Sequence, residues 1–221
     1  MRILVLLGAP GAGKGTQAHI LARHLGLPRI ATGDLFRAAV RAGTPLGLEV
    51  KEFMERGEFV PDETTVRMLL ERLDAPDASH GAILDGFPRN RAQASALDES
   101  LAKRGSRVEL ALYIAVPEDE LLARLSGRWV CQAHGHTYHE VAYPPRVPGV
   151  CDVDGSPLVQ RDDDRPEVVR ARLENQLGGL REVVDYYRPL GILRVIDGRR
   201  PIAAVTADLL DAIEPKPYWR A

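Results

Sequence analysis

The sequence contains little cysteine, little lysine and no long apolar run. Only two of its 221 residues are cysteine. Two thiols are too few for a disulfide scaffold and, without an export signal, they predict a reducing cytoplasm. The apolar run near the N-terminus covers residues 3–7, and no stretch approaches the roughly 20 apolar residues of a membrane span. We therefore expect a cytoplasmic protein without a membrane segment.

Neither sign of charge dominates the chain, whose formal net charge is −2. This balance argues against a general binder of nucleic acid or membrane surfaces, because such proteins usually carry a strongly basic face. Of the 29 basic residues only four are lysine, so a lysine in a motif is a stronger signal here than an arginine. With 45% hydrophobic residues, the length predicts one globular domain, residues 1–221, with a substantial core.

A glycine-rich stretch, GAPGAGKGT at residues 8–16, joins the apolar run to a helical pattern over residues 17–25. Glycines allow successive backbone N–H groups to converge on one point, where the helix dipole and the Lys14 ammonium add positive charge. The stretch therefore predicts a phosphate-binding loop. Its one departure from G-x-x-x-x-G-K-[ST] is Gly15, which replaces the hydroxyl that ligates magnesium. We expect any Mg²⁺ to depend on nucleotide oxygens and water.

The rest of the chain alternates between short apolar runs and helical patterns. Strands are predicted near residues 3–7, 28–31, 82–84, 110–116 and 192–196. This alternation predicts an α/β fold with a five-stranded parallel sheet covered by helices on both faces. Two stretches interrupt it: a small helical insertion at 31–60, and residues 127–164, where helical periodicity disappears and Cys, His, Gly, Pro and Asp accumulate. Ligands are expected at the carboxyl ends of the strands.

Four motifs, in this order and spacing, resemble those of an adenylate kinase of the long-lid bacterial form. They are residues 8–17, Thr32-Gly33-Asp34, Asp85-Gly86-Phe87-Pro88-Arg89 and Gln93. The resemblance covers nearly the whole chain. It implies a P-loop kinase fold in which residues 31–60 are the NMP-binding module and residues 127–164 are the lid. It also implies transfer of the terminal phosphoryl group of ATP to AMP, giving two ADP, with Mg²⁺ as the metal and a monomer as the working form.

The resemblance further implies which residues touch the nucleotides. The implied catalytic residues are Lys14, Asp85, Arg89, Arg128, Arg161 and Arg172. The implied ATP contacts are Gly11, Ala12, Gly13, Lys14, Gly15, Thr16, Arg124, Arg128, Thr137, Tyr138 and Arg200. The implied AMP contacts are Thr32, Arg37, Glu58, Phe59, Val60, Gly86, Phe87, Pro88, Arg89, Gln93, Arg161 and Arg172, and the Phe87–Pro88 bond is expected to be cis.

These residue types suit phosphoryl transfer, because a guanidinium stays charged and binds two phosphate oxygens at once. Asp85 follows a buried strand, where a carboxylate can orient water on the nucleotide's Mg²⁺; the alternative is that it caps the following turn. In so arginine-rich a chain, any one arginine could instead be structural or solvated. The Gln93 amide can both accept from and donate to an adenine edge, which favours AMP over UMP or CMP as acceptor.

Two short ligand pairs lie in the second insertion, Cys131-x-x-His134 and Cys151-x-x-Asp154. They resemble the metal-bearing lid of some adenylate kinases. Four protein ligands would fill a tetrahedral site, so the resemblance implies a structural Zn²⁺. The alternatives are a metal-free lid held by hydrogen bonds, or two unrelated thiols beside a surface histidine and aspartate. His136 and His139 are rivals for the histidine ligand.

The motifs leave two other functions open. The chain could phosphorylate UMP, CMP or another monophosphate. In a different class, it could be a zinc-ribbon interaction or nucleic-acid module on an inactive nucleotide-binding scaffold, which would need a basic lid. The lid instead carries five aspartates, namely Asp152, Asp154, Asp162, Asp163 and Asp164. We therefore expect no nucleic-acid partner.

Overall fold

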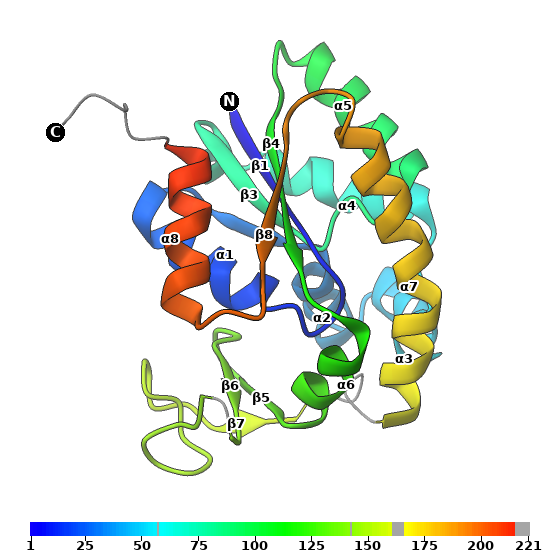
Figure 1. Cartoon of the computed structure of the whole chain (residues 1–221). Helices are drawn as coiled ribbons and strands as arrows, with labels where there is room; N and C mark the ends of the chain where they lie inside the picture. Colours follow the sequence, from blue (N-terminus) through cyan, green and yellow to red (C-terminus); the bar gives the residue numbers. More distant parts are fainter. Residues whose placement is uncertain (57, 142, 161–165, 215–221) are drawn as a thin grey trace, which may run out of the picture.

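A five-stranded parallel sheet forms the centre of the molecule, with strand order β2-β3-β1-β4-β8 (Figure 1). The computed structural model describes residues 1–56, 58–141, 143–160 and 166–214, without the side chains of residues 166, 167 and 172. The strands are β1 Arg2–Leu7, β2 Arg29–Ala31, β3 Gly81–Asp85, β4 Arg107–Ala115 and β8 Leu193–Asp197. Parallel neighbours need crossover connections, which the intervening helices supply. The predicted α/β fold and its five parallel strands are confirmed.

Helices cover both faces of the sheet, and the side chains of β1 show why. Ile3, Val5 and Leu7 belong to one apolar cluster, whereas Leu4 and Leu6 belong to the other. Successive side chains of a strand point to opposite faces, so an unbroken apolar run fits a strand that is buried on both sides. All five of these side chains are at most 2% exposed.

The helices divide between these two clusters. On one face lie α1 Lys14–Leu25, α6 Glu118–Ser126 and α8 Ile202–Ile213; on the other lie α4 Asp62–Leu73 and α5 Arg91–Lys103. The long helix α7, Pro166–Tyr187, contributes its first half to the first cluster and its second half to the other. A short 3₁₀ turn, η1 Pro76–Ala78, precedes β3. Figure 1 shows α1 and α8 on one side of the sheet and α5 and α7 on the opposite side.

The first insertion is helical, as expected. It contains α2 Thr32–Arg41 and α3 Pro45–Arg56. The small apolar core of this insertion includes Phe36, Val50 and Val60. The two helices approach closely at Gly47, where a Cβ would lie 2.1 Å from the carbonyl oxygen of Ala39. A glycine is therefore required at this crossing.

The second insertion forms a separate antiparallel sheet. Its strands are β5 Arg128–Cys131, β6 Thr137–His139 and β7 Leu158–Val159, in the order β6-β5-β7. Among its described residues, the buried side chains are Val130, Cys131, Tyr138, Cys151 and Leu158. In Figure 1 this sheet lies beyond the carboxyl ends of the central strands, next to α6. Among the described helices, none combines the length and the apolar character needed to cross a bilayer.

Candidate active site

The glycine-rich stretch forms a turn between β1 and α1. Gly11 has φ 83° and Gly13 has φ 93°, a region that residues with a Cβ rarely adopt. Gly13 stands at the N-cap of α1 and makes no side-chain cap. The first amide groups of the helix are therefore available to an anion, which is the arrangement that binds phosphate.

The Lys14 side chain is held against this loop by backbone carbonyl groups of the loop. Its Nζ donates to the carbonyl oxygens of Gly8, at 2.7 Å, and Ala9, at 2.9 Å. The ammonium thus lies over the loop, beside the first amides of α1. Three sources of positive potential, the amides, the helix dipole and the ammonium, coincide at one point.

A cavity of about 660 Å³ opens above the loop. It lies between the first insertion, the carboxyl ends of the central strands and the second insertion. All eleven residues expected at ATP line it, namely Gly11, Ala12, Gly13, Lys14, Gly15, Thr16, Arg124, Arg128, Thr137, Tyr138 and Arg200. Of the residues expected at AMP, those that line it are Arg37, Glu58, Val60, Gly86 and Arg89, and the expected Asp85 lines it as well. One cleft therefore joins both expected sites.

Several residues expected at AMP lie behind the cavity wall. Thr32 is 1% exposed and its hydroxyl donates to the Gly86 carbonyl oxygen at 3.0 Å. Phe87 is fully buried, and its bond to Pro88 is cis, as the resemblance implies. Phe59 lies with its ring 5.9 Å from the Arg89 guanidinium carbon. Arg161 and the side chain of Arg172 lie outside the described residues.

Gln93 differs most from expectation. Its side chain is buried, its Oε1 accepts from the Arg89 backbone N–H at 2.8 Å, and its Nε2 donates to Asp62 Oδ1 at 2.7 Å. Both ends of the amide are thus used within the protein, where they fix the backbone of Arg89. The position of Gln93 in the first turn of α5, beside α4, brings it to Asp62, and sequence spacing does not reveal this.

The arginines of the cleft are held by carbonyls and carboxylates. Arg89 Nε donates to the Gly86 carbonyl oxygen at 2.7 Å, and Arg124 Nη1 donates to the Gly198 carbonyl oxygen at 3.0 Å. Arg200 forms an ion pair with Asp208. These bonds restrict where each guanidinium lies, so the positive charges are arranged before a nucleotide arrives.

Arg29, which no sequence motif marks as functional, pairs with two carboxylates at the edge of the cavity. It donates to Asp85 Oδ2 and to Asp34 Oδ2, and Asp34 Oδ1 accepts from Arg37. Burial alone would raise the pKa of Asp34, but the charges of Arg29 and Arg37 outweigh it and hold this pKa far below its usual value. Asp34 is therefore ionised. The available signal was an arginine on a short predicted strand beside the T-G-D motif.

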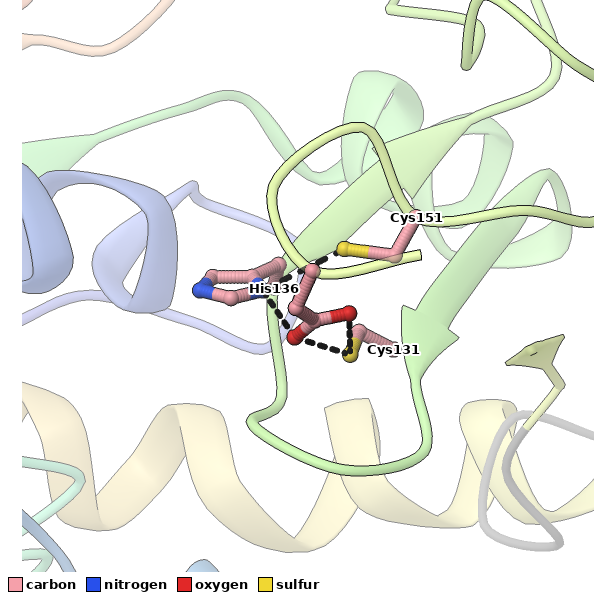
Figure 2. A group of neighbouring side chains, drawn as sticks. Cys131, His136 and Cys151 are labelled. Carbon is pink, nitrogen blue, oxygen red and sulfur yellow. Dashed lines mark hydrogen bonds and ion pairs between the residues drawn. The ribbon is translucent and has the colours of Figure 1, made fainter. Parts of the chain in front are cut away.

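A group of metal-ligand side chains lies in the second insertion. Ligand atoms of Cys131, His136, Cys151 and Asp154 all lie within 4.8 Å of one another. His136 Nδ1 is 3.3 Å from Cys151 Sγ and 3.3 Å from Asp154 Oδ2, and Cys131 Sγ is 3.2 Å from the same oxygen. Figure 2 shows the Cys131 sulfur and the imidazole next to the carboxylate, and the Cys151 sulfur next to the imidazole. Two thiols, an imidazole and a carboxylate form a donor set that suits Zn²⁺.

The histidine in this group is His136, whereas the sequence spacing predicts His134. The hairpin register explains the difference: Cys131 N–H donates to the His136 carbonyl oxygen at 2.8 Å, so these two residues face each other across the hairpin. The His134 side chain is 66% exposed and its Nδ1 contacts Asp154 Oδ2 at 2.7 Å. His134 thus contacts the group through Asp154. His139, the other rival, lines the cavity.

Burial also sets the protonation of this group. It raises the pKa of the Cys131 thiol and lowers the pKa of His136. The imidazole is therefore neutral, which is the form that binds a metal. A cation would displace the thiol protons on binding, so its affinity would rise with pH.

Comparison with known proteins agrees with this geometry. The family model described as adenylate kinase matches residues 6–192. A protein from Exiguobacterium sibiricum named adenylate kinase is 48% identical over 206 residues, which are 93% of this chain and 96% of that protein. Proteins of the same name from Shouchella clausii and Staphylococcus aureus are 47% and 45% identical, each over 96% of this chain and 98% of its own length. The chain therefore belongs to the adenylate kinase family, and its activity is that of a nucleoside monophosphate kinase that uses AMP.

Proposed function

We propose that the cleft holds ATP and AMP end to end, with their phosphates meeting above the glycine-rich loop, and exchanges them for two ADP. The observation that carries this proposal is the single cavity of about 660 Å³ that reaches both sets of expected residues. Phosphoryl transfer needs little covalent help from a protein. It needs two anions aligned, water excluded and the charge on the moving group stabilised.

Within this proposal, the loop and the second insertion hold the donor. Lys14 and the loop amides bind the donor phosphates, Arg124 stacks on its adenine, and Thr137 and Tyr138 cover it. Arg128 and Arg89 flank the transferring group. We assign Arg161 and Arg172 to the same group on the family resemblance alone. A guanidinium that is already fixed by protein carbonyls loses little freedom when it binds phosphate.

The first insertion and the end of β3 hold the acceptor. Arg37 and Arg89 bind its phosphate. Residues 58–60 close the base pocket, together with Thr32, Gly86, Phe87, Pro88 and Gln93. In the structure the Gln93 amide already bonds Asp62 and Arg89. These bonds leave one lone pair on Oε1 and one hydrogen on Nε2 for the edge of the adenine.

Mg²⁺ would arrive with ATP and neutralise phosphate charge. Asp85 is the residue that would face it, through water, because Gly15 offers no hydroxyl. Every proposed contact to either nucleotide comes from one chain, so a monomer is sufficient.

The acceptor site is tested by comparing AMP, CMP, UMP and GMP in an assay that measures ADP release. We expect AMP to give a kcat/KM at least about tenfold above the others, because an unpaired buried polar group costs about 1–3 kcal/mol. A compound that joins two adenosines through a phosphate chain should compete with both nucleotides. Competition with only one of them, or a preference for CMP or UMP, would contradict the proposed arrangement.

We further propose that Cys131, His136, Cys151 and Asp154 hold a structural Zn²⁺ in the lid. All four positions of a tetrahedral site would be filled by protein, so the ion would stabilise the lid and take no part in transfer. His134 would then orient Asp154 from outside the ligand set.

Metal analysis of the purified protein tests this proposal. We expect about one zinc per chain, lost in Cys151→Ser and in His136→Asn but retained in the matched variant His134→Asn. If His136→Asn retained zinc and His134→Asn lost it, the histidine ligand would be His134, as the sequence spacing predicts. Zinc-free parent protein that keeps its thermal stability would refute the structural ion.

A further inference from the structure

Four side chains of alternating charge form a continuous chain along one edge of the cleft: Asp85, Arg29, Asp34 and Arg37. Arg29 Nη2 and Nε donate to Asp85 Oδ2 at 2.7 and 3.1 Å. Arg29 Nη1 donates to Asp34 Oδ2, and Arg37 Nη2 donates to Asp34 Oδ1, both at 2.5 Å. One guanidinium therefore bridges two carboxylates, and the second carboxylate holds another guanidinium.

The pair of Arg29 and Asp85 in this chain is shielded from water, whereas Asp34 is more exposed. The side chains of Arg29 and Asp85 are 15% and 9% exposed. Charge-assisted hydrogen bonds in such a setting are stronger and less screened than surface ion pairs. Arg29 is thus held rigidly, although it lines the cavity that receives the nucleotides.

Arg29 also lies against the glycine-rich loop. A Cβ built on Gly15 would be 3.7 Å from Arg29 Nη2 and 3.7 Å from Asp85 Oδ2. The guanidinium and the carboxylate therefore lie beside the position that G-x-x-x-x-G-K-[ST] gives to a hydroxyl. Both Arg29 donors to Asp85 end on Oδ2, so Oδ1 keeps its capacity to accept a bond from water on a nucleotide-bound cation.

Asp85 and Asp34 are negatively charged, as are the nucleotide phosphates that the cleft is proposed to bind. A fixed cation beside the two carboxylates therefore reduces their repulsion of the phosphates. Without Arg29, Asp85 would repel the incoming anions, and Asp34 would have Arg37 as its remaining ion-pair partner among the described residues. A lysine could supply the charge but not the planar set of donors that reaches both carboxylates at once.

We propose that Arg29 is a positioning residue that joins the two halves of the site: it fixes Asp85 on the donor side and, through Asp34, aims Arg37 at the acceptor phosphate. This inference rests on the proposed roles of Asp85 and Arg37. It concerns a residue that touches neither nucleotide in the proposed function.

The first test measures AMP binding by calorimetry without Mg²⁺. We expect Arg29→Gln to weaken AMP binding about tenfold. Without Arg29, the Asp34 carboxylate is no longer fixed, and it therefore holds Arg37 less firmly. Arg29→Lys should recover part of this loss. Asp34→Asn should have a similar effect, and the double variant Arg29→Gln with Asp34→Asn should add little, because both changes break the same chain.

The second test measures turnover against Mg²⁺ concentration. We expect Arg29→Gln to shift the half-saturating Mg²⁺ concentration at least about threefold, because Asp85 is released from its partner. The matched control is Arg72→Gln. Arg72 forms a two-bond ion pair with Asp77 on an exposed surface, at 2.8 and 2.6 Å, and does not line the cleft. It should stay within about twofold of the parent in both tests.

Each outcome decides the proposal. If Arg29→Gln lowers only the melting temperature and matches Arg72→Gln in AMP affinity and Mg²⁺ dependence, Arg29 is merely a structural ion pair and the proposal is overturned. If Arg29→Gln changes only the AMP affinity or only the Mg²⁺ dependence, Arg29 does not join the donor side to the acceptor side. If instead Arg37→Ala leaves AMP affinity unchanged, the proposed acceptor site fails independently of Arg29.

Discussion

The central sheet and the lid sheet are held together in different ways. The central sheet lies between two large apolar clusters, and its strand β1 is buried along both faces. The described part of the lid has five buried side chains, two of them cysteines, while Val141, Val147 and Val153 remain exposed. Burial alone therefore stabilises the core, whereas the lid needs another link, which the proposed metal would supply.

This difference matches the tasks of the two regions. The loop that must hold phosphates rigidly is anchored between a buried strand and a helix that packs on the core through Ala18 and Leu21. The lid, with few apolar contacts, can move as a small unit on the microsecond to millisecond scale that such closures use. One contact between the two regions is a pair of histidines, His19 on α1 and His136 in the lid, whose ring centres are 5.6 Å apart.

The largest expected effect separates chemistry from stability within the core. Lys14→Met should reduce kcat about 10³-fold, because the ammonium stabilises charge on the phosphates during transfer. The melting temperature should change little, since Lys14 belongs to neither of the two apolar clusters that hold the central sheet. Steady-state kinetics and a thermal melt measure both quantities. Wild-type turnover in this variant would contradict the proposed role of the glycine-rich loop in phosphoryl transfer.

The next effect compares matched leucines in the two regions. Leu84→Ala in β3, where the side chain is fully buried, should lower the free energy of global unfolding by about 3 kcal/mol. Leu158→Ala in the lid, where the side chain is 7% exposed, should lower it by less than about 1 kcal/mol. Urea denaturation of both variants gives the comparison. Equal losses would show that lid and core unfold as one unit.

The smallest effect concerns the lid metal. Removing it with a chelator should lower the melting temperature by about 2–4 °C, the shift that 1 kcal/mol produces in a chain of this size. Amide exchange should quicken mainly in residues 128–159. The value of kcat should stay within about threefold, because four protein ligands leave the ion no open position for a substrate. Exchange that quickens equally in the central strands would contradict the separation of the two regions.

Local features made much of the molecule predictable. The run at residues 3–7 indicates a strand buried on two faces because nearly any other placement would expose it. Gly11, Gly13 and Lys14 indicate a phosphate loop because the backbone geometry and the charge are encoded within a few residues. The accumulation of turn-forming residues after position 127 likewise indicates a module without helices.

Three features of the site depend on contacts between distant segments. The choice of His136 over His134 follows from the hairpin that pairs it with Cys131. Gln93 bonds Asp62 because α4 and α5 pack together. Arg29 meets Asp85 because β2 lies beside β3.

The sequence by itself determined the strands, the phosphate loop and the family, because periodicity, glycine conformation and motif order are properties of neighbouring residues. Only the tertiary structure decided which histidine joins the two thiols and which arginine holds the two carboxylates. These pairings depend on strand register and helix packing, which bring together side chains that the chain itself keeps far apart.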